Sequence, residues 1–141
     1  MRKIRHIIIH CAATPEGKEF TIKDIEKWHR QRGFTVVNGV ACGYHYVINL
    51  DGSISIGRPL ERVGAHTLGR NADSIGICYI GGCDKNMKPK DTRTELQKSA
   101  LEKRVKELLK QFPGARVSGH NEWAHKACPC FDVPKWWESV K

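Results

Sequence analysis

The sequence has no long hydrophobic run. Behind the basic start Met1-Arg2-Lys3, the apolar stretch covers only residues 4–9 and is interrupted by Arg5 and His6. Such a stretch is too short and too broken for a secretory signal peptide or a membrane-spanning helix. We therefore expect a chain that is synthesised in the cytoplasm without a signal peptide and that does not insert into a membrane.

Acidic residues are scarce relative to basic ones. Fifteen Asp and Glu stand against twenty-four Lys and Arg, which gives a formal net charge of +9. This balance favours a polyanionic partner such as a nucleic acid, a membrane surface or an acidic cell-wall polymer. The basic residues between positions 103 and 110 lie on a predicted amphipathic helix and are most simply its solvated face. We therefore predict no nucleic-acid partner.

The six cysteines predict thiols rather than a disulfide framework. They are scattered at positions 11, 42, 78, 83, 128 and 130 of a chain in which we expect no export signal, and disulfides persist mainly in exported proteins. With 141 residues and 40% hydrophobic content, the chain is long enough to bury a core without bridges. We predict a single domain covering residues 1–141, with mostly reduced cysteines.

Segments of strand and helix character alternate along the chain. Residues 4–10 contain four isoleucines and predict a strand buried on both faces. Alternating residues around Asp51-Gly52 predict a hairpin with a two-residue turn, whose first strand places Tyr44 and Tyr46 on one face. The predicted strands are residues 4–10, 44–50, 53–56, 74–80 and 115–118, and the predicted helices are residues 21–33, 92–112 and 133–138, an arrangement typical of an α/β fold.

The first two helices carry recognisable N-terminal caps. Thr21 can cap the first helix together with Asp24, and Thr92 can cap the second together with Glu95. His29 lies on the first helix, at the spacing of its apolar stripe. We predict that His29 is structural or exposed to solvent.

Residues 119–132 concentrate groups able to bind a metal or to stabilise an oxyanion. His120 and Cys128 lie eight residues apart, Lys126 lies between them, and Pro129 stiffens the backbone beside the thiol. Taken alone, Lys126 is most simply a surface lysine. The spacing nevertheless forces these side chains close together.

A further imidazole, His10, ends the first predicted strand, and His120 follows the end of another. Taken alone, His10 most simply caps a carbonyl group. However, functional side chains in α/β proteins commonly lie where strands end and loops begin. If the two strands are neighbours in one sheet, both imidazoles can face one cavity and form a zinc site with Cys128. Three protein ligands leave a fourth position for water, as in catalytic zinc sites.

Two other side chains are candidates because of their positions. Periodicity makes Tyr44 a tyrosine at the edge of the core, but it follows Cys42-Gly43 at the mouth of a strand, which leaves a catalytic use open. His66 lies in a glycine-bounded loop, where little packing accounts for it. For His66, a binding role and a structural role have equal weight.

Six short motifs occur in a fixed order: His10-Cys11-Ala12-Ala13-Thr14, Gly43-Tyr44-His45-Tyr46, Asp51-Gly52, Val63-Gly64-Ala65-His66, Ser74-Ile75-Gly76-Ile77, and Ala127-Cys128-Pro129 with Phe131-Asp132. In the order and spacing of these motifs, the chain resembles N-acetylmuramoyl-L-alanine amidases of the type 2 family, in particular the bacteriophage T7 lysozyme branch. Peptidoglycan recognition proteins are related to this family. The resemblance covers nearly the whole chain.

The resemblance implies a central mixed β-sheet flanked by helices, and zinc as the cofactor. The site residues that it implies are His10, His120 and Cys128 as zinc ligands, Tyr44 and Lys126 as catalytic groups, and His66 as a residue that lines the substrate groove.

The resemblance also implies an activity. A zinc amidase of this family hydrolyses the amide bond between the lactyl group of N-acetylmuramic acid and L-alanine of the peptidoglycan stem peptide, so peptidoglycan or muropeptides are the expected partners. A monomeric phage or prophage endolysin would reach the wall through a holin or a secretion system, and recycling of wall fragments is the alternative setting. The alternative functions are a non-catalytic peptidoglycan-binding module and a regulatory protein that binds an RNA polymerase.

Two positions depart from the family pattern. Cys130 occurs where relatives usually carry a small polar residue, and His125 occurs where proline is common. Cys130 could replace Cys128 on the metal or oxidise with it. We prefer Cys128 as the ligand because it keeps the spacing from His120 and Lys126.

Overall fold

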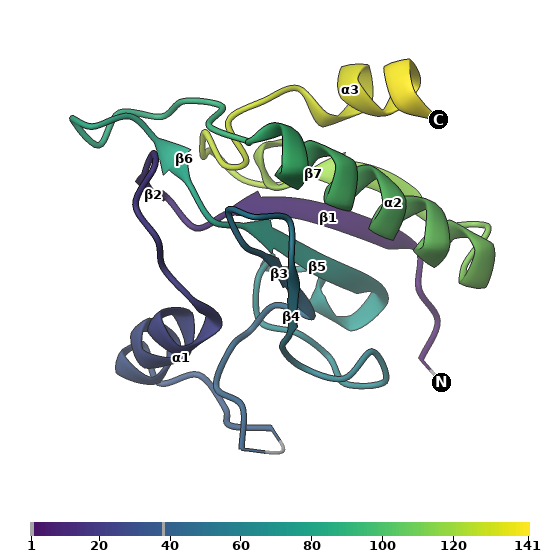
Figure 1. Ribbon diagram of the computed structural model, residues 1–141. Coiled ribbons are helices and arrows are strands. Elements are labelled where there is room, and N and C mark those ends of the chain that lie inside the picture. The colour runs from purple at the N-terminus through teal and green to yellow at the C-terminus, as the bar shows by residue number, and fades with distance from the viewer. Residues whose placement is uncertain (1, 38) are drawn as a thin grey trace.

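The computed structural model describes residues 2–37 and 39–141, and a five-stranded sheet forms its centre (Figure 1). Among the described residues, four of the five strands run parallel and the edge strand β4 pairs antiparallel with β3. The sheet is therefore mixed, as predicted. In spatial order, its strands are β4 (Ile54–Ile56), β3 (Tyr46–Ile48), β5 (Ser74–Tyr79), β1 (His6–Cys11) and β7 (Arg116–Gly119), and the short strands β2 (Thr14–Pro15) and β6 (Gly82–Cys83) pair separately.

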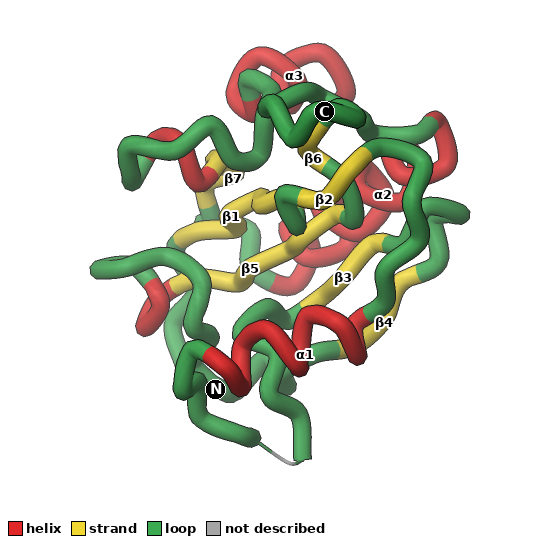
Figure 2. Tube along the Cα trace, turned by 90° about the vertical axis from the view of Figure 1, so that its left-hand side faces the viewer, coloured by secondary structure: helices red, strands yellow, loops and turns green. Residues whose placement is uncertain are grey.

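Helices cover both faces of this sheet (Figure 1, Figure 2). α2 and α3 share a core with Ile7 and Ile9 of β1, whereas α1 packs on the opposite face through Ile25, against Val47 and Cys78. The predicted α/β class is confirmed. The helices are α1 (Ile22–Gln31), α2 (Glu95–Gln111) and α3 (Val133–Val140), with the 3₁₀ turns η1 (Asn71–Asp73) and η2 (His120–Glu122). In the part of the chain that the structure describes, none of the helices is long and apolar enough to cross a membrane.

β1 lies between β5 and β7 and is buried on both faces, as predicted. Residues 7–9 are wholly inaccessible to solvent, because strands flank β1 on both sides and helices cover the sheet above and below. In the parallel register with β7, Ile9 lies opposite Gly119. His10 and His120 are the next residues of their segments, so the end of the sheet brings them together.

α1 begins where predicted, with Thr21 as N-cap and Asp24 closing the capping box. His29 is only 5% exposed, and its Nδ1 accepts a hydrogen bond from the backbone N–H of Gly43 at 2.8 Å. The predicted structural role of His29 is confirmed, and its predicted alternative, exposure to solvent, is wrong. Burial lowers the pKa of His29 to about 4, so its ring is neutral at neutral pH.

α2 begins two residues later than predicted. Its N-cap is Thr94 rather than Thr92, and Gln97 rather than Glu95 completes the capping box. Thr92 instead accepts a hydrogen bond from the backbone N–H of Gly82 at 2.8 Å. The buried amide of Gln97 also donates to two backbone carbonyls, which an ionised carboxylate cannot do.

The hairpin of β3 and β4 forms, but its loop has three residues rather than two. The N–H of Asn49 donates to the carbonyl of Ser53 at 2.8 Å, and the N–H of Gly52 donates to the carbonyl of Asn49 at 2.9 Å. Gly52 has a φ of 84°, the left-handed conformation that glycine adopts freely. Because β3 begins at Tyr46, Tyr44 precedes the strand. The prediction that they share a face is wrong: Tyr44 packs on the α1 side and Tyr46 on the other.

Acid should destabilise the fold through His29. This side chain has an ordinary pKa of 6.5 and a pKa of about 4 in the folded protein. Between these values the unfolded chain binds more protons, so the stability that is fully present above pH 6.5 is lost as the pH falls towards 4. We predict that lowering the pH from about 7.5 to about 5 reduces the free energy of unfolding by about 1–2 kcal/mol through the protonation of His29 alone.

Urea unfolding at the two pH values measures this effect, with His29→Asn as the comparison. Asparagine keeps an acceptor close to the Nδ1 position but does not titrate in this range. The loss of stability should be smaller in the variant by about the predicted amount. An equal loss in both proteins would contradict the assignment.

Candidate functional site

The three candidate ligands converge from distant parts of the chain. His10 lies in β1, His120 opens η2 directly after β7, and Cys128 lies in the loop before α3. One ligand atom of each lies within 4.8 Å of the other two. The ring centroids of His10 and His120 are 4.5 Å apart. The condition set from the sequence, that the strands preceding these two loops are neighbours, is confirmed.

The strand period explains the direction in which His10 points. Its neighbours Ile9 and Cys11 pack in the core beneath α2 and α3. Successive side chains of a strand point to opposite faces, so the imidazole of His10 points to the face that α1 covers.

The donor set fits zinc. Bonds of about 2.0–2.1 Å to nitrogen and about 2.3 Å to sulfur in a tetrahedral site separate the two donor atoms by about 3.6 Å. His10 Nδ1 and Cys128 Sγ lie 3.9 Å apart. Within residues 2–37 and 39–141, this cluster contains no fourth His, Cys, Asp or Glu. A metal held here would keep one position open, the arrangement typical of catalytic zinc.

Burial favours the protonation state that metal binding requires. His10 is 1% exposed, and burial lowers its pKa well below the usual value. Burial also lowers the pKa of His120, and the positive charge of Lys126 adds to this effect. A neutral imidazole has a free lone pair for a metal. Both rings are therefore ready to act as ligands at neutral pH.

Cys128, rather than Cys130, has its sulfur in the cluster. Cys128 Sγ accepts a hydrogen bond from the backbone N–H of Cys11 at 3.2 Å. Cys130 Sγ points elsewhere: it donates to the carbonyl of Gly82 at 3.2 Å and lies 3.9 Å from Cys11 Sγ. All six cysteines are free thiols in the structure. The geometry therefore favours Cys128 as the ligand.

Tyr44 lies against the cluster because it precedes β3. Its ring centroid is 5.1 Å from that of His10 and 5.4 Å from that of His29. Burial raises the pKa of Tyr44 well above the usual value. The phenol therefore remains protonated near neutral pH and can donate a hydrogen bond.

Lys126 provides a positive charge on the exposed side of the cluster. Its side chain is exposed, on the loop between His120 and Cys128. Burial is the main cause of the lowered pKa of His10 and of His120, and the positive charge of Lys126 adds to it. An anion that formed next to the open metal position would be attracted to this group.

His66 contacts the side of His10 that faces away from Cys128. His66 Nδ1 lies 2.8 Å from His10 Nε2. The hydroxyl of Thr67 lies 3.2 Å from the same nitrogen and is buried. Sequence reasoning identified His66 but missed Thr67, because a hydroxyl next to a loop histidine carries no pattern of its own.

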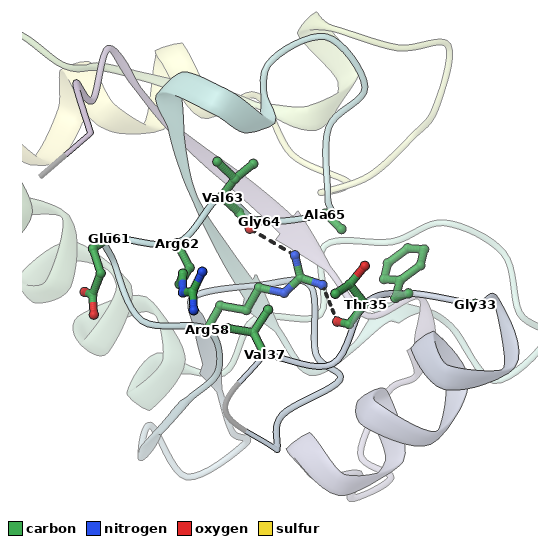
Figure 3. Close-up of a pocket in the computed structure, with 10 residues that line it drawn as sticks. Gly33, Thr35, Val37, Arg58, Glu61, Arg62, Val63, Gly64 and Ala65 are labelled. Atoms are coloured by element: carbon green, nitrogen blue, oxygen red, sulfur yellow. Dashed lines mark hydrogen bonds between the residues drawn. The ribbon is translucent and has the colours of Figure 1, made fainter.

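A cavity of about 610 Å³ adjoins the loop that carries His66 (Figure 3). Arg58 crosses this region and donates to the carbonyl of Val63 at 2.9 Å and to that of Thr35 at 2.8 Å. It thereby joins the loop after β4 to the segment after α1. Sequence reasoning also missed Arg58, for which no motif gave a signal. The cavity is lined by Gly33, Phe34, Thr35, Val37, Arg58, Glu61, Arg62, Val63, Gly64 and Ala65.

The α/β fold and the open three-donor cluster define a candidate metallohydrolase. The family model described as N-acetylmuramoyl-L-alanine amidase matches residues 1–131. The chain belongs to this family, and the resemblance stated from its motifs is confirmed.

Relatives and solved structures agree with this assignment. The endolysin of Escherichia phage T7 is 38% identical over 132 residues, which cover 94% of this chain and 84% of the endolysin. The N-acetylmuramoyl-L-alanine amidase LysC from Clostridium intestinale URNW has a TM-score of 0.79 at 26% identity, covering 99% of this chain and 84% of LysC. The complex of tracheal cytotoxin with the ectodomains of peptidoglycan recognition proteins LCa and LCx has a TM-score of 0.71 at 27% identity, covering 92% of this chain and 77% of the matched one.

The two neighbouring thiols should differ in metal binding. We predict that Cys128→Ser weakens zinc affinity by at least about 100-fold, because it removes a thiolate ligand. Cys130→Ser, the matched control, should change the affinity by less than about threefold, because its sulfur lies outside the cluster. Competition with a chromophoric chelator measures both affinities. The reverse order of the two effects would assign the ligand to Cys130 instead.

Proposed function

We propose that this protein is a zinc-dependent N-acetylmuramoyl-L-alanine amidase that cleaves the bond between the lactyl group of N-acetylmuramic acid and L-alanine of the stem peptide. The observation that carries the proposal is the cluster of His10, His120 and Cys128 in a chain of this family. Tyr44 and Lys126 beside the cluster supply groups suited to amide hydrolysis.

In this proposal His10, His120 and Cys128 hold the zinc ion. When bound, zinc would lower the pKa of a coordinated water towards about 7 and would polarise the scissile carbonyl. The two neutral imidazoles and the thiolate leave one net positive charge at the site. The backbone N–H of Cys11, which donates to Cys128 Sγ, stabilises the negative charge of that ligand.

Two side chains act on the substrate. The ammonium group of Lys126 stabilises the negative charge that develops on the carbonyl oxygen, a contribution of about 2.7–4 kcal/mol for one donor in measured cases. The protonated phenol of Tyr44 orients the attacking water or exchanges a proton with it. The cavity beside the His66 loop gives room for part of the substrate, and contact of His66 with substrate remains a prediction.

The biological setting that fits these relatives best is a phage or prophage endolysin. The T7 relative is an endolysin, and a related recognition protein binds tracheal cytotoxin. We therefore propose peptidoglycan or its soluble muropeptides as the partner, reached after release through a holin or a secretion system. The net charge of +9 would attract the protein to anionic wall polymers.

The release of free L-alanine amino termini from purified sacculi tests the reaction. We expect the wild-type protein to release them, chelation to abolish the release, and added zinc to restore it. Catalysis that survives both complete zinc removal and Cys128→Ser would refute the mechanism.

Two substitutions separate the roles of the groups beside the metal site. Lys126→Met should lower kcat by about 10²–10³-fold, because it removes a donor to the oxyanion. Tyr44→Phe should lower kcat by about 10²-fold or more, because it removes the phenolic proton. Lys103→Met, on the exposed face of α2, is the matched lysine control and should keep wild-type turnover. Equal turnover in the Lys126 and Lys103 variants would remove Lys126 from the mechanism.

A further inference from the structure

The two ring nitrogens of His10 face different partners. Nδ1 lies 3.9 Å from Cys128 Sγ, on the side of the candidate metal site. Nε2 lies 2.8 Å from His66 Nδ1 and 3.2 Å from the hydroxyl oxygen of Thr67. Any ion shared with Cys128 therefore binds Nδ1, and His66 and Thr67 contact the nitrogen that remains.

A neutral imidazole carries one N–H, and its position decides whether His10 can bind a metal. If the proton is on Nε2, that nitrogen donates to His66 and Nδ1 keeps a free lone pair. If His66 donates instead, the proton of His10 moves to Nδ1 and blocks the metal. When His66 Nδ1 accepts a hydrogen bond, the proton of His10 stays on Nε2 and His10 Nδ1 can act as a metal ligand.

The far side of His66 completes a directional chain of hydrogen bonds. When its Nδ1 accepts from His10, its own proton lies on Nε2, which faces the hydroxyl of Ser74 at 3.3 Å. The Thr67 hydroxyl lies 3.0 Å from His66 Nδ1. Each polar atom in the chain from His10 to Ser74 thus has a partner in the metal-competent arrangement.

The surrounding backbone holds the His66 ring in place. The backbone N–H groups of His66 and Thr67 both donate to Asn71 Oδ1 at 2.9 Å. The ring lies on Gly76 of β5, where an added Cβ would be 2.6 Å from His66 Cδ2 and 2.8 Å from Nε2. Any residue other than glycine at position 76 would place its Cβ in the space that the His66 ring occupies. The fold therefore provides a fixed site for an aromatic acceptor behind His10.

We propose that His66 is a positioning residue for the metal site, which fixes the ring orientation and the tautomer of His10. This inference rests on the proposed metal site and goes beyond a contact with substrate. Partners behind a metal-ligating histidine raise its basicity, and their removal costs about 10–100-fold in metal affinity. His66 should therefore act on zinc binding even when no substrate is present.

Zinc affinity, measured by competition with a chromophoric chelator, tests the proposal with three proteins. We expect His66→Leu to weaken zinc binding about 10–100-fold relative to wild type. His66→Asn places an amide oxygen near the position of Nδ1, so it should restore affinity to within about threefold of wild type. In the cobalt-substituted proteins, the visible d–d spectrum should change in the leucine variant and resemble wild type in the asparagine variant.

The thermal unfolding of the three metal-free proteins is the control for folding. Two outcomes overturn the proposal while leaving the function standing: wild-type affinity in the leucine variant, or equal losses in the leucine and asparagine variants. The second outcome would indicate packing rather than an acceptor. If the wild-type protein itself binds no zinc, the proposed function fails, and the positioning role fails with it.

Discussion

The parallel pairing of β1 with β7 is the constraint on which the rest of the site depends. It sets Ile9 opposite Gly119 and thereby brings His10 and His120 to the same end of the sheet. A shift of one residue in β1 would turn His10 into the core beneath α2 and α3, because side chains alternate between faces. Such a shift would be costly because it would place the imidazole of His10 among the apolar side chains that pack around Ile7, Ile9 and Cys11.

The face that carries the cluster buries several polar side chains. His10, His29, His45 and Thr67 are all buried there. Burial lowers the pKa of His29 and of His45 to about 4, so the protein buries neutral rings rather than charges. Each of these rings has a hydrogen-bond partner, which keeps the cost of burial small. The result is a preorganised site in which little has to move when a metal binds.

The strands of the central sheet and the three candidate ligands could be predicted from the sequence because strong local signals mark them, whereas the short strands β2 and β6 were not predicted. A run of isoleucines marks β1, and the short spacing between His120 and Cys128 limits how far apart they can lie. The start of α2 could not be predicted because the sequence offers two overlapping capping boxes, Thr92 with Glu95 and Thr94 with Gln97. Tertiary contacts chose between them, since Gln97 also satisfies carbonyls of the sheet region.

The position of Tyr44 and the surroundings of His66 lay beyond sequence reasoning for a similar reason. Strand alternation placed Tyr44 with Tyr46, but β3 begins only at Tyr46, and the preceding bend turns Tyr44 towards His10. The hydrogen bonds of His66 depend on segments that are distant in the sequence, so no local pattern reports them. Spacing along the chain reveals which groups can meet, whereas the direction of each ring nitrogen depends on the folded backbone.

X-ray absorption at the zinc edge of the metal-loaded protein tests the central claim most directly, because it counts sulfur and nitrogen neighbours separately. We predict one sulfur at about 2.3 Å and three nitrogen or oxygen neighbours at about 2.0–2.1 Å, one of which exchanges with solvent. Two sulfur neighbours, or none, would contradict the assignment of His10, His120 and Cys128 as the ligands around one open metal position.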